Sequence, residues 1–312
     1  MKRSDENLFG VSITPHAKSS DESFQIAKLV DDLETIDLVG IQDHPYTASY
    51  VDTWTLLTAL ATSTRRVRFF TNVADLPLRL PSVLAKAAAT LDLMTKGRIE
   101  LGIGAGTFWK AITGFGGPSR TGSEAVSALE EAIQVIRLIW NPDKANKRKT
   151  VSFEGKFYRL QEARPGPAPR HAIEIWIGAQ RPKMLNLIGR LGDGWSIPLQ
   201  SYLPTERIND AQKIIDEAAR AKGRNPSSIR RIRGLAGIID NEDHLEKSLR
   251  GQGEIVVGSA SDWVDELFFN VKELGVDSFV FWPASEGNEL EQIRLFAERV
   301  VPQFKERMKA SP

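Results

Sequence analysis

The sequence predicts an α/β fold, a single (β/α)8 or TIM barrel that spans residues 1–312 as one domain. Eight short apolar runs recur along the chain, and each is followed by a stretch with apolar residues at helical spacing. The runs are continuously apolar, as expected for strands that are buried on both faces. Repeated strand–helix units imply parallel strands joined by right-handed crossovers, and eight such units favour a closed barrel.

Four strand–helix units make up the first half of the chain. The first strand (FGVSIT) ends before Pro15, and Pro81 stands near the start of the third helix, where proline is favoured. We expect strands at 9–14, 37–42, 67–73 and 98–104, and helices at 21–36, 53–62, 82–94 and 124–140. Between the fourth strand and its helix, glycines and aromatic residues up to about residue 122 predict a loop.

The alternation is interrupted once, by an insertion after the fourth helix at about residues 141–172. This insertion contains a charged stretch, a predicted hairpin around residues 154–156 and the proline-rich segment ARPGPAPRH. The alternation then resumes. We expect strands at 174–178, 194–198, 229–239 and 278–282, and helices at 183–191, 206–222, 263–274 and 290–307.

Composition excludes several kinds of chemistry. The chain has no cysteine, so it forms no disulfide, thiolate nucleophile, cysteine zinc site or iron–sulfur cluster. Its formal charge is +1, which gives no reason to expect a nucleic-acid or membrane partner. No ligand spacing supports a metal, so none is expected. The polar N-terminus does not resemble a signal peptide, and no apolar run approaches the roughly 20 residues of a membrane helix. We therefore expect a cytoplasmic protein.

In a barrel of this type the site lies at the C-terminal ends of the strands. Asp43 and His44 directly follow the second strand, and Asn72 and Val73 end the third. An imidazole moves protons near neutral pH, and an adjacent carboxylate can fix its tautomer. His44 is therefore a candidate acid or base, with a histidine that only caps a turn as the alternative.

Glycines follow the fourth strand. Gly104 and Gly106 precede Thr107, in a segment that superficially resembles a dinucleotide-binding loop. The aromatic residues that come next predict a loop and not the helix start that the dinucleotide fingerprint requires. Close approach of the backbone to a planar ligand is the better explanation of these glycines.

A second glycine-led segment joins the fifth strand to its helix and consists of Gly178, Ala179, Gln180 and Arg181. Backbone N–H groups at that helix N-terminus, together with Arg181, predict a phosphate cradle, with a plain strand–helix turn as the alternative. Trp195, on the sixth strand, is a candidate wall for a pocket that holds a flat aromatic ligand, with core packing as the alternative.

Several blocks of the sequence together resemble the bacterial luciferase-like family of flavin and deazaflavin oxidoreductases. They occur in the family's order and cover nearly the whole chain: DLVGIQDH at 37–44, residues 71–78, PSVLAKAAATLDLMTKGRIELGIGAG at 81–106, VSFEGKFYRL at 151–160, IWIGAQRPKMLNLIGRLGDGW at 175–195, and residues 257–280. The resemblance implies a barrel whose C-terminal mouth holds the cofactor. It also implies a homodimer that packs through the helices at 53–62 and 82–94.

The resemblance further implies roles for particular residues. Asn72–Val73 matches the family's non-prolyl cis-peptide bulge behind the cofactor ring, and Asp43 and His44 match positions near the reactive ring. The segment that begins at Gly178 matches the loop that binds the cofactor phosphate. The glycine-rich residues 105–122 and the insertion at 141–172 would flank the substrate, the insertion as a lid or specificity element.

Three positions depart from activities known in that family. Thr107 stands where deazaflavin sugar-phosphate dehydrogenases carry a carboxylic acid. Tyr46, Thr47 and Ala48 stand where a tryptophan is expected shortly after His44. The reactive cysteine of bacterial luciferase is missing. Neither of these two activities is therefore transferred to this chain.

The sequence favours an FMN-dependent monooxygenase that uses reduced flavin and O2 on a small organic substrate. A separate reductase would supply the reduced flavin. In this interpretation His44 is the acid or base near the ring, and Asp43 orients it or contacts the ring. The absence of a second nucleotide-binding motif is consistent with flavin that is reduced elsewhere.

Three alternatives remain open. Within the family, a coenzyme F420-dependent enzyme would transfer hydride, with Arg79, Arg120 or Arg181 near the cofactor's acidic tail and a deazaflavin reductase as its source of electrons. A non-redox hydrolase would need Asp43 and Glu100 to converge, unless strand four buries Glu100 against Arg98 or Arg68. A flavin-binding carrier would bind the ligand without turnover.

Overall fold

The computed structural model describes residues 7–240, 255–285 and 287–311. Eight parallel strands form the barrel: β1 (Leu8–Ile13), β2 (Leu38–Ile41), β3 (Arg68–Thr71), β5 (Ile99–Gly104), β8 (Ile175–Gly178), β9 (Gly194–Ile197), β10 (Arg230–Ile239) and β12 (Ser278–Pro283). Each strand pairs with the next one in this order, and β12 pairs with β1, which closes the sheet on itself. The predicted (β/α)8 barrel is confirmed.

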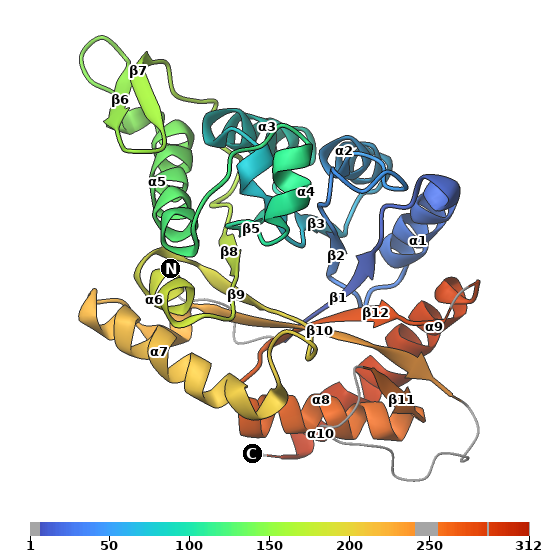
Figure 1. Cartoon of the computed structure of the whole chain (residues 1–312). Coiled ribbons are helices and arrows are strands. Elements are labelled where there is room, and N and C mark those ends of the chain that lie inside the picture. Colours follow the sequence, from blue (N-terminus) through green and yellow to red (C-terminus); the bar gives the residue numbers. More distant parts are fainter. Residues whose placement is uncertain (1–6, 241–254, 286, 312) are drawn as a thin grey trace.

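The helices pack around the outside of these strands (Figure 1). They are α1 (Ser20–Asp32), α2 (Thr53–Ser63), α3 (Pro81–Met94), α5 (Gly122–Trp140), α6 (Pro182–Leu191), α7 (Ile208–Ala221) and α8 (Ala260–Leu274), followed by α9 (Glu289–Leu295), the π-helical η6 (Phe296–Val300) and α10 (Val301–Ala310). The single helix expected at 290–307 corresponds to α9, η6 and α10, which follow one another without a break. Among the described residues, no helix has both the length and the apolar character needed to cross a bilayer.

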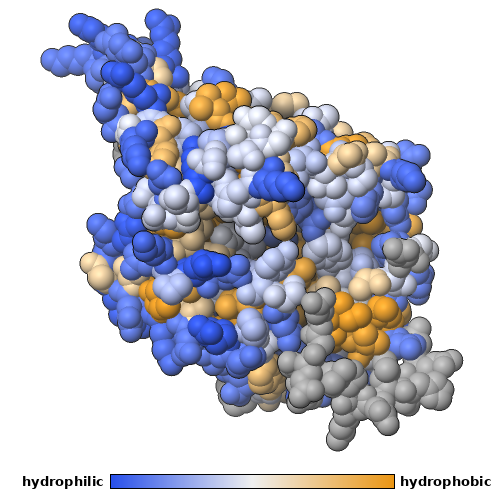
Figure 2. All heavy atoms as spheres, in the orientation of Figure 1, coloured by the Kyte–Doolittle hydropathy of each residue, from blue (hydrophilic) through white to orange (hydrophobic). Residues whose placement is uncertain are grey.

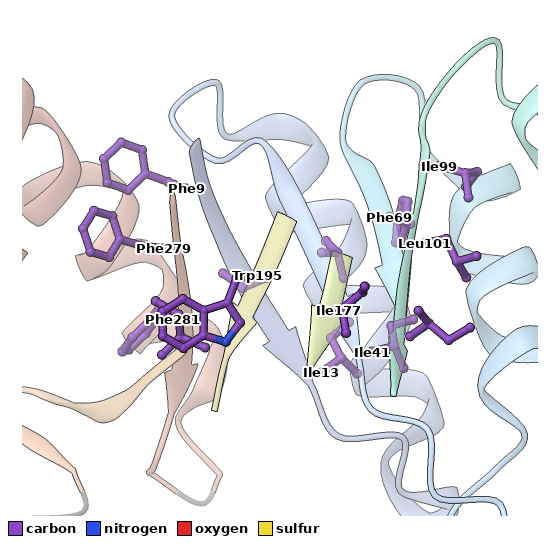
Figure 3. Close-up of a cluster of buried hydrophobic side chains, with 14 of the residues drawn as sticks. Phe9, Ile13, Ile41, Phe69, Ile99, Leu101, Ile177, Trp195, Phe279 and Phe281 are labelled. Atoms are coloured by element: carbon purple, nitrogen blue, oxygen red, sulfur yellow. The ribbon is translucent and has the colours of Figure 1, made fainter. Parts of the chain in front are cut away.

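The strand side chains divide between two cores. Alternate residues such as Phe9, Phe69 and Ile177 point outward and pack against the helices in the larger core (Figure 3). A smaller cluster lies inside the barrel and consists of Leu8, Leu38, Phe70, Trp176, Ile232 and Val280. Toward the C-terminal ends of the strands, the positions that alternate with the outer core are small: Ser12, Gly102, Gly104, Gly178 and Ser196. The barrel is therefore filled with bulky side chains at one end and lined with small residues at the other.

Three local features differ from the predicted elements. The third strand ends early and resumes as the two-residue β4 (Ala74–Asp75), because Asn72 and Val73 interrupt the pairing. A short strand, β11 (Val256–Gly258), extends the pairing of β10. The expected aromatic loop contains α4 (Trp109–Gly114), so the prediction of a loop without a helix was wrong there. This helix has no side-chain cap to signal it in the sequence, and its buried Ile112 anchors it.

The insertion contains the predicted hairpin, formed by β6 (Val151–Glu154) and β7 (Arg159–Ala163). It projects beyond α5 at one edge of the molecule, and its outer surface is mostly hydrophilic (Figures 1 and 2). Glu131 of α5 accepts hydrogen bonds from the backbone N of three consecutive turn residues, at 2.9, 2.8 and 3.0 Å. One carboxylate therefore fixes the hairpin turn onto α5.

Candidate active site

Val73 lies where the C-terminal ends of several strands meet. A Cβ atom on Gly104 would come within 2.9 Å of the Val73 Cγ2 atom, and one on Gly178 within 3.0 Å. The backbones of β5 and β8 therefore contact this valine directly. The Asn72–Val73 peptide bond is cis, as predicted. Asn72 also accepts a hydrogen bond from the Ser196 hydroxyl at 3.1 Å. The structure thus brings four predicted residues together at the mouth.

Gly106 and Thr107 continue this rim. Gly106 has a φ of +92°, and a Cβ atom there would lie 2.7 Å from Pro77 Cγ. Both facts require glycine, because the loop after β5 passes close to the loop after β4. Thr107 and the neighbouring Phe108 are exposed at the outer edge. These residues bound the mouth on the β5 side.

Asp43 is buried and is held by a network on the β4 side. Its carboxylate accepts hydrogen bonds from Arg79 Nε at 2.7 Å, from Arg79 Nη2 at 2.6 Å and from the Asp75 backbone N at 3.0 Å. Arg79 also donates to Asp52 at 2.8 Å. Burial opposes the charge of Arg79, but its hydrogen bonds to Asp43 and Asp52 raise its pKa, so the guanidinium stays charged. Within the described residues, the hydrogen bonds of Asp43 go to Arg79 and to the Asp75 backbone, so they do not support its expected role as the orienter of His44.

Tyr46 is the hydrogen-bond partner of His44. The Nδ1 atom of His44 lies 2.8 Å from the Tyr46 hydroxyl. Burial lowers the pKa of His44, which the nearby Asp43 charge only partly offsets, so the imidazole is neutral at neutral pH. Burial and the charges of Asp75 and Asp43 raise the pKa of Tyr46, so the phenol keeps its proton. We assign the phenol as donor to Nδ1, which puts the ring proton of His44 on Nε2.

An aromatic wall surrounds this pair. The His44 ring centroid lies 5.7 Å from that of Tyr46, 6.4 Å from that of Tyr50 and 5.8 Å from that of Phe108. His16, just after β1, packs edge-on against Tyr50 at 4.8 Å. The wall therefore joins the loops after β1, β2 and β5. In the sequence Tyr46 stood out only as a departure from an expected tryptophan, and Tyr50 was missed, because only the folded loops place these residues beside His44.

Two further buried polar atoms lie at the mouth without partners. The Ser12 hydroxyl oxygen and Asp75 Oδ1 have no hydrogen-bond partner within the described part of the chain. Buried polar groups are normally satisfied, so such atoms indicate a site that a ligand completes. Sequence reasoning placed Asp75 at the end of the third strand but assigned neither residue a role. The only available signal was the place of Asp75 directly after the predicted bulge.

The predicted phosphate loop leads into α6. Arg181 is exposed and is the N-cap residue of that helix, and it makes no side-chain capping bond. Gly178, Ala179 and Gln180 precede it, so the first N–H groups of α6 face the end of this loop. Trp195 is fully buried in the outer core, and its Nε1 donates to the Ala179 carbonyl at 2.9 Å. Trp195 therefore supports the loop from behind, and this position gives no support to its expected place in a pocket wall.

A groove of about 530 Å³ lies beside the mouth. It is lined by Pro45, by residues 76–80, by residues 115–118 and by Tyr158 from the hairpin. Arg120, also in the lining, donates to the Tyr158 hydroxyl at 3.3 Å. The glycine-rich segment and the insertion thus meet at one groove, next to the loop that carries His44.

Glu100 lies at the opposite end of the barrel from Asp43. It is the second residue of β5, and its carboxylate contacts Arg68 at 3.2 Å and His171 at 3.3 Å. Burial against Arg68 is therefore confirmed. Asp43, in contrast, follows the C-terminal end of β2. Because the two carboxylates do not converge, the geometry does not support the hydrolase.

The mouth fits a flat cofactor with a phosphate group. Small residues surround Val73, two buried polar atoms are unpartnered, and a helix N-terminus follows the Gly178 loop. No group of three or more potential metal ligands occurs in the described ranges. These residues would hold a ring against the valine and a phosphate at α6.

Comparison with known proteins identifies the family. A family profile described as luciferase-like monooxygenase matches residues 8–251. The chain belongs to this luciferase-like family. Two solved structures share the fold of this luciferase-like chain. An F420-dependent secondary alcohol dehydrogenase, in complex with an F420-acetone adduct, is 19% identical with a TM-score of 0.80 and aligns over 96% of this chain and 99% of its own. The monooxygenase RslO1 from Streptomyces bottropensis is 22% identical with a TM-score of 0.79, over 95% and 99%.

Curated relatives match part of the luciferase-like chain. The phthiodiolone/phenolphthiodiolone dimycocerosates ketoreductase of Mycobacterium tuberculosis is 34% identical over 209 residues, which is 63% of this chain and 50% of the relative. An F420-dependent glucose-6-phosphate dehydrogenase of Kineococcus radiotolerans is 32% identical over 191 residues, or 57% and 54%. The chain thus spans about half the length of these relatives. The proteins to which the chain is similar include F420-dependent dehydrogenases and a monooxygenase.

Proposed function

We propose that this protein is a hydride-transfer oxidoreductase that binds coenzyme F420 and reduces the carbonyl group of a small organic substrate. The observation that carries this proposal is the neutral, hydrogen-bonded pair of His44 and Tyr46 at the barrel mouth. Carbonyl reduction needs a hydride at carbon and a proton at oxygen. The reduced cofactor supplies the hydride, and the pair holds a proton that the site can donate.

The chain's own residues have three tasks in this mechanism. Val73, Gly104 and Gly178 form the surface against which the ring would lie. The N-terminus of α6 would bind the phosphate. Tyr46 holds His44 in the tautomer with its proton on Nε2. As Nε2 gives this proton to the substrate oxygen, Nδ1 takes up the phenol proton of Tyr46, so the imidazole stays neutral and the phenolate regains a proton from solvent after product release.

An FMN-dependent monooxygenase, which the sequence favoured, is the second candidate. Thr107 supports it, because the carboxylic acid of the deazaflavin sugar-phosphate dehydrogenases is absent there. The relatives reverse the order of the two candidates. Those that are 32–34% identical to the chain are named as a ketoreductase and an F420-dependent dehydrogenase, whereas the monooxygenase RslO1 is 22% identical. Either candidate would depend on a separate reductase for its reduced cofactor.

A turnover experiment separates these candidates. Reduced F420 is mixed anaerobically with the enzyme and a panel of ketones, and reoxidation is followed by absorbance; in parallel, O2 uptake is measured with reduced FMN. Ketone-dependent reoxidation without O2 is the expected result. O2 uptake with FMN that exceeds the autoxidation of free reduced FMN and puts ¹⁸O into an organic substrate would favour the monooxygenase, and binding of both cofactors without turnover would favour the carrier.

Tyr46→Phe tests the proton donor. We expect kcat to fall by about 10²-fold, toward the lower end of the contribution of acid–base catalysis, with little change in F420 affinity. Tyr50→Phe, which removes a hydroxyl from the same aromatic wall and keeps the ring beside His44, is the matched control. Equal rates for the two variants would refute the role of Tyr46.

We also propose that the protein forms a homodimer through α3, in line with the family resemblance. Leu80, Val83 and Met94 are 59%, 62% and 61% exposed on or just before this helix. Such a set of exposed apolar side chains is typical of a contact surface.

A further inference from the structure

Asp75 faces the inside of the barrel mouth. It is paired in register with Gly104 of β5, and registered residues of neighbouring parallel strands point to the same face of the sheet. Gly104 points inward, where it contacts Val73. Asp75 is only 6% exposed, and its Oδ1 atom has no hydrogen-bond partner among the residues that the structure describes. A buried carboxyl oxygen therefore stands next to the predicted ring site.

Two of the three carboxyl groups in this part of the site are paired with one guanidinium. Arg79 donates to Asp43 and Asp52, whereas Asp75 feels only its charge. Burial, followed by the negative charge of Asp43, raises the pKa of Asp75 to about 7, against the opposing effect of Arg79. Of two close carboxyl groups, the one without the counter-ion retains the proton.

The groups that face Asp75 come from three elements. Asp43 and Tyr46 lie on the loop after β2, Arg79 lies on the segment after β4, and β5 contributes the uncharged Gly104. Asp43 is paired with Arg79, and Tyr46 is a neutral phenol. A proton on Asp75 therefore removes repulsion from this cluster, and it makes the carboxyl group a hydrogen-bond donor.

We propose that Asp75 is a ligand-binding residue that, as a neutral carboxylic acid, donates a hydrogen bond to a carbonyl oxygen on the polar edge of the bound flavin or deazaflavin ring. The inference rests on the proposed function, because it requires a ring against Val73. Once ionised, Asp75 has no proton to donate and repels the acceptor oxygen. The ring therefore binds more tightly below about pH 7 than above it.

The test is a fluorescence titration with oxidised F420 and, separately, with FMN, at several values between about pH 6 and pH 8. In the wild type, tight binding requires the protonated form of a group that titrates with a midpoint near pH 7. The Kd is therefore expected to rise about tenfold between pH 6 and pH 8. Asp75→Asn keeps a donor and cannot ionise, so its Kd lacks this rise. Titration of the ligand itself affects both proteins equally, so it cancels in the ratio of the wild-type Kd to the Asp75→Asn Kd. This ratio is expected to rise about tenfold between about pH 6 and pH 8.

Asp37→Asn is the matched control. Asp37 is also a carboxyl group whose pKa is raised by burial, but it lies at the opposite end of the barrel, where it accepts from the Phe9 backbone N. This variant is expected to follow the wild-type profile. Saturable binding by Asp75→Asn with a ratio of Kd values that does not change with pH would overturn the inference. Loss of the pH-dependent rise in Kd in Asp37→Asn as well would also overturn it. Absence of binding in every variant would overturn the proposed function together with it.

A second measurement needs no substitution and applies even if Asp75→Asn does not fold. The infrared difference spectrum of wild-type protein labelled with ¹³C-aspartate, with and without cofactor, reports protonated carboxyl groups. We expect a protonated-carboxyl band that shifts on cofactor binding at pH 6 and is lost by about pH 8. If cofactor binds and no such band shifts, Asp75 does not donate to the ring.

Discussion

Replacement of Arg79 tests how the carboxylate cluster is held together. The Asp43 side chain is 0% exposed and depends on Arg79 for two hydrogen bonds, of 2.7 and 2.6 Å. Removing one partner of a buried ion pair costs about 3–5 kcal/mol, because a buried charge is left without compensation. The bond to Asp52, whose side chain is 44% exposed, adds only about 0–1 kcal/mol. Arg79→Met, which keeps an unbranched apolar stem, is therefore expected to lower the free energy of unfolding by about 4 kcal/mol.

The assay is urea unfolding at neutral pH, with Asp52→Asn as the matched control. That control removes only the exposed partner and is expected to cost about 1 kcal/mol or less. The double variant Arg79→Met with Asp43→Asn should cost much less than the sum of its parts, because no buried charge remains. A loss no larger than that of Asp52→Asn would refute the reasoning.

Three further predictions concern other parts of the molecule. Burial disfavours charge on His171, but hydrogen bonds to two carboxylates raise its pKa to about 10. The charged imidazole therefore stabilises the fold fully below about pH 6.5, and this contribution is lost as pH rises through about 10. The unfolding defect of His171→Asn, about 2 kcal/mol at pH 7 after allowance for its partial exposure, should therefore vanish above pH 10, and a pH-independent defect would contradict this. Gly104→Ala, whose methyl would lie 2.9 Å from Val73, should weaken cofactor binding about tenfold or more, while Gly122→Ala, with nothing within 4 Å, should not. Val83→Lys should sediment as a monomer where the wild type sediments as a dimer; a wild-type monomer would exclude the proposed interface.

The barrel was predictable because each strand and helix carries its own local pattern. A strand that is buried on both faces and a helix with one apolar stripe can each be recognised from local sequence alone, without knowledge of the neighbouring elements. The short helix α4 lacks such a local pattern and was therefore not predictable. It has neither a capping residue nor a full apolar stripe, and it is held by the single buried side chain of Ile112.

The site was predictable only in part. Position at a strand end indicated Asp43 and His44, and the family resemblance indicated the Asn72–Val73 bulge. The partners of these residues depend on contacts between loops that are far apart in sequence. Arg79 reaches Asp43 across 36 residues, so no local pattern shows that His44 must find another partner.

The attachment of the hairpin has a consequence for how such a chain diversifies. Its two strands form a sheet separate from the barrel, and its turn is bound to α5 through the carboxylates of Glu131 and Glu124. The turn also carries Tyr158, which lines the groove, so changes there alter one border of the groove and leave the barrel ladder intact. The hairpin is thus an exchangeable module. Grafting another sequence between residues 151 and 163 should succeed where the turn length and the α5 glutamates are retained, and selectivity can drift there without loss of the scaffold.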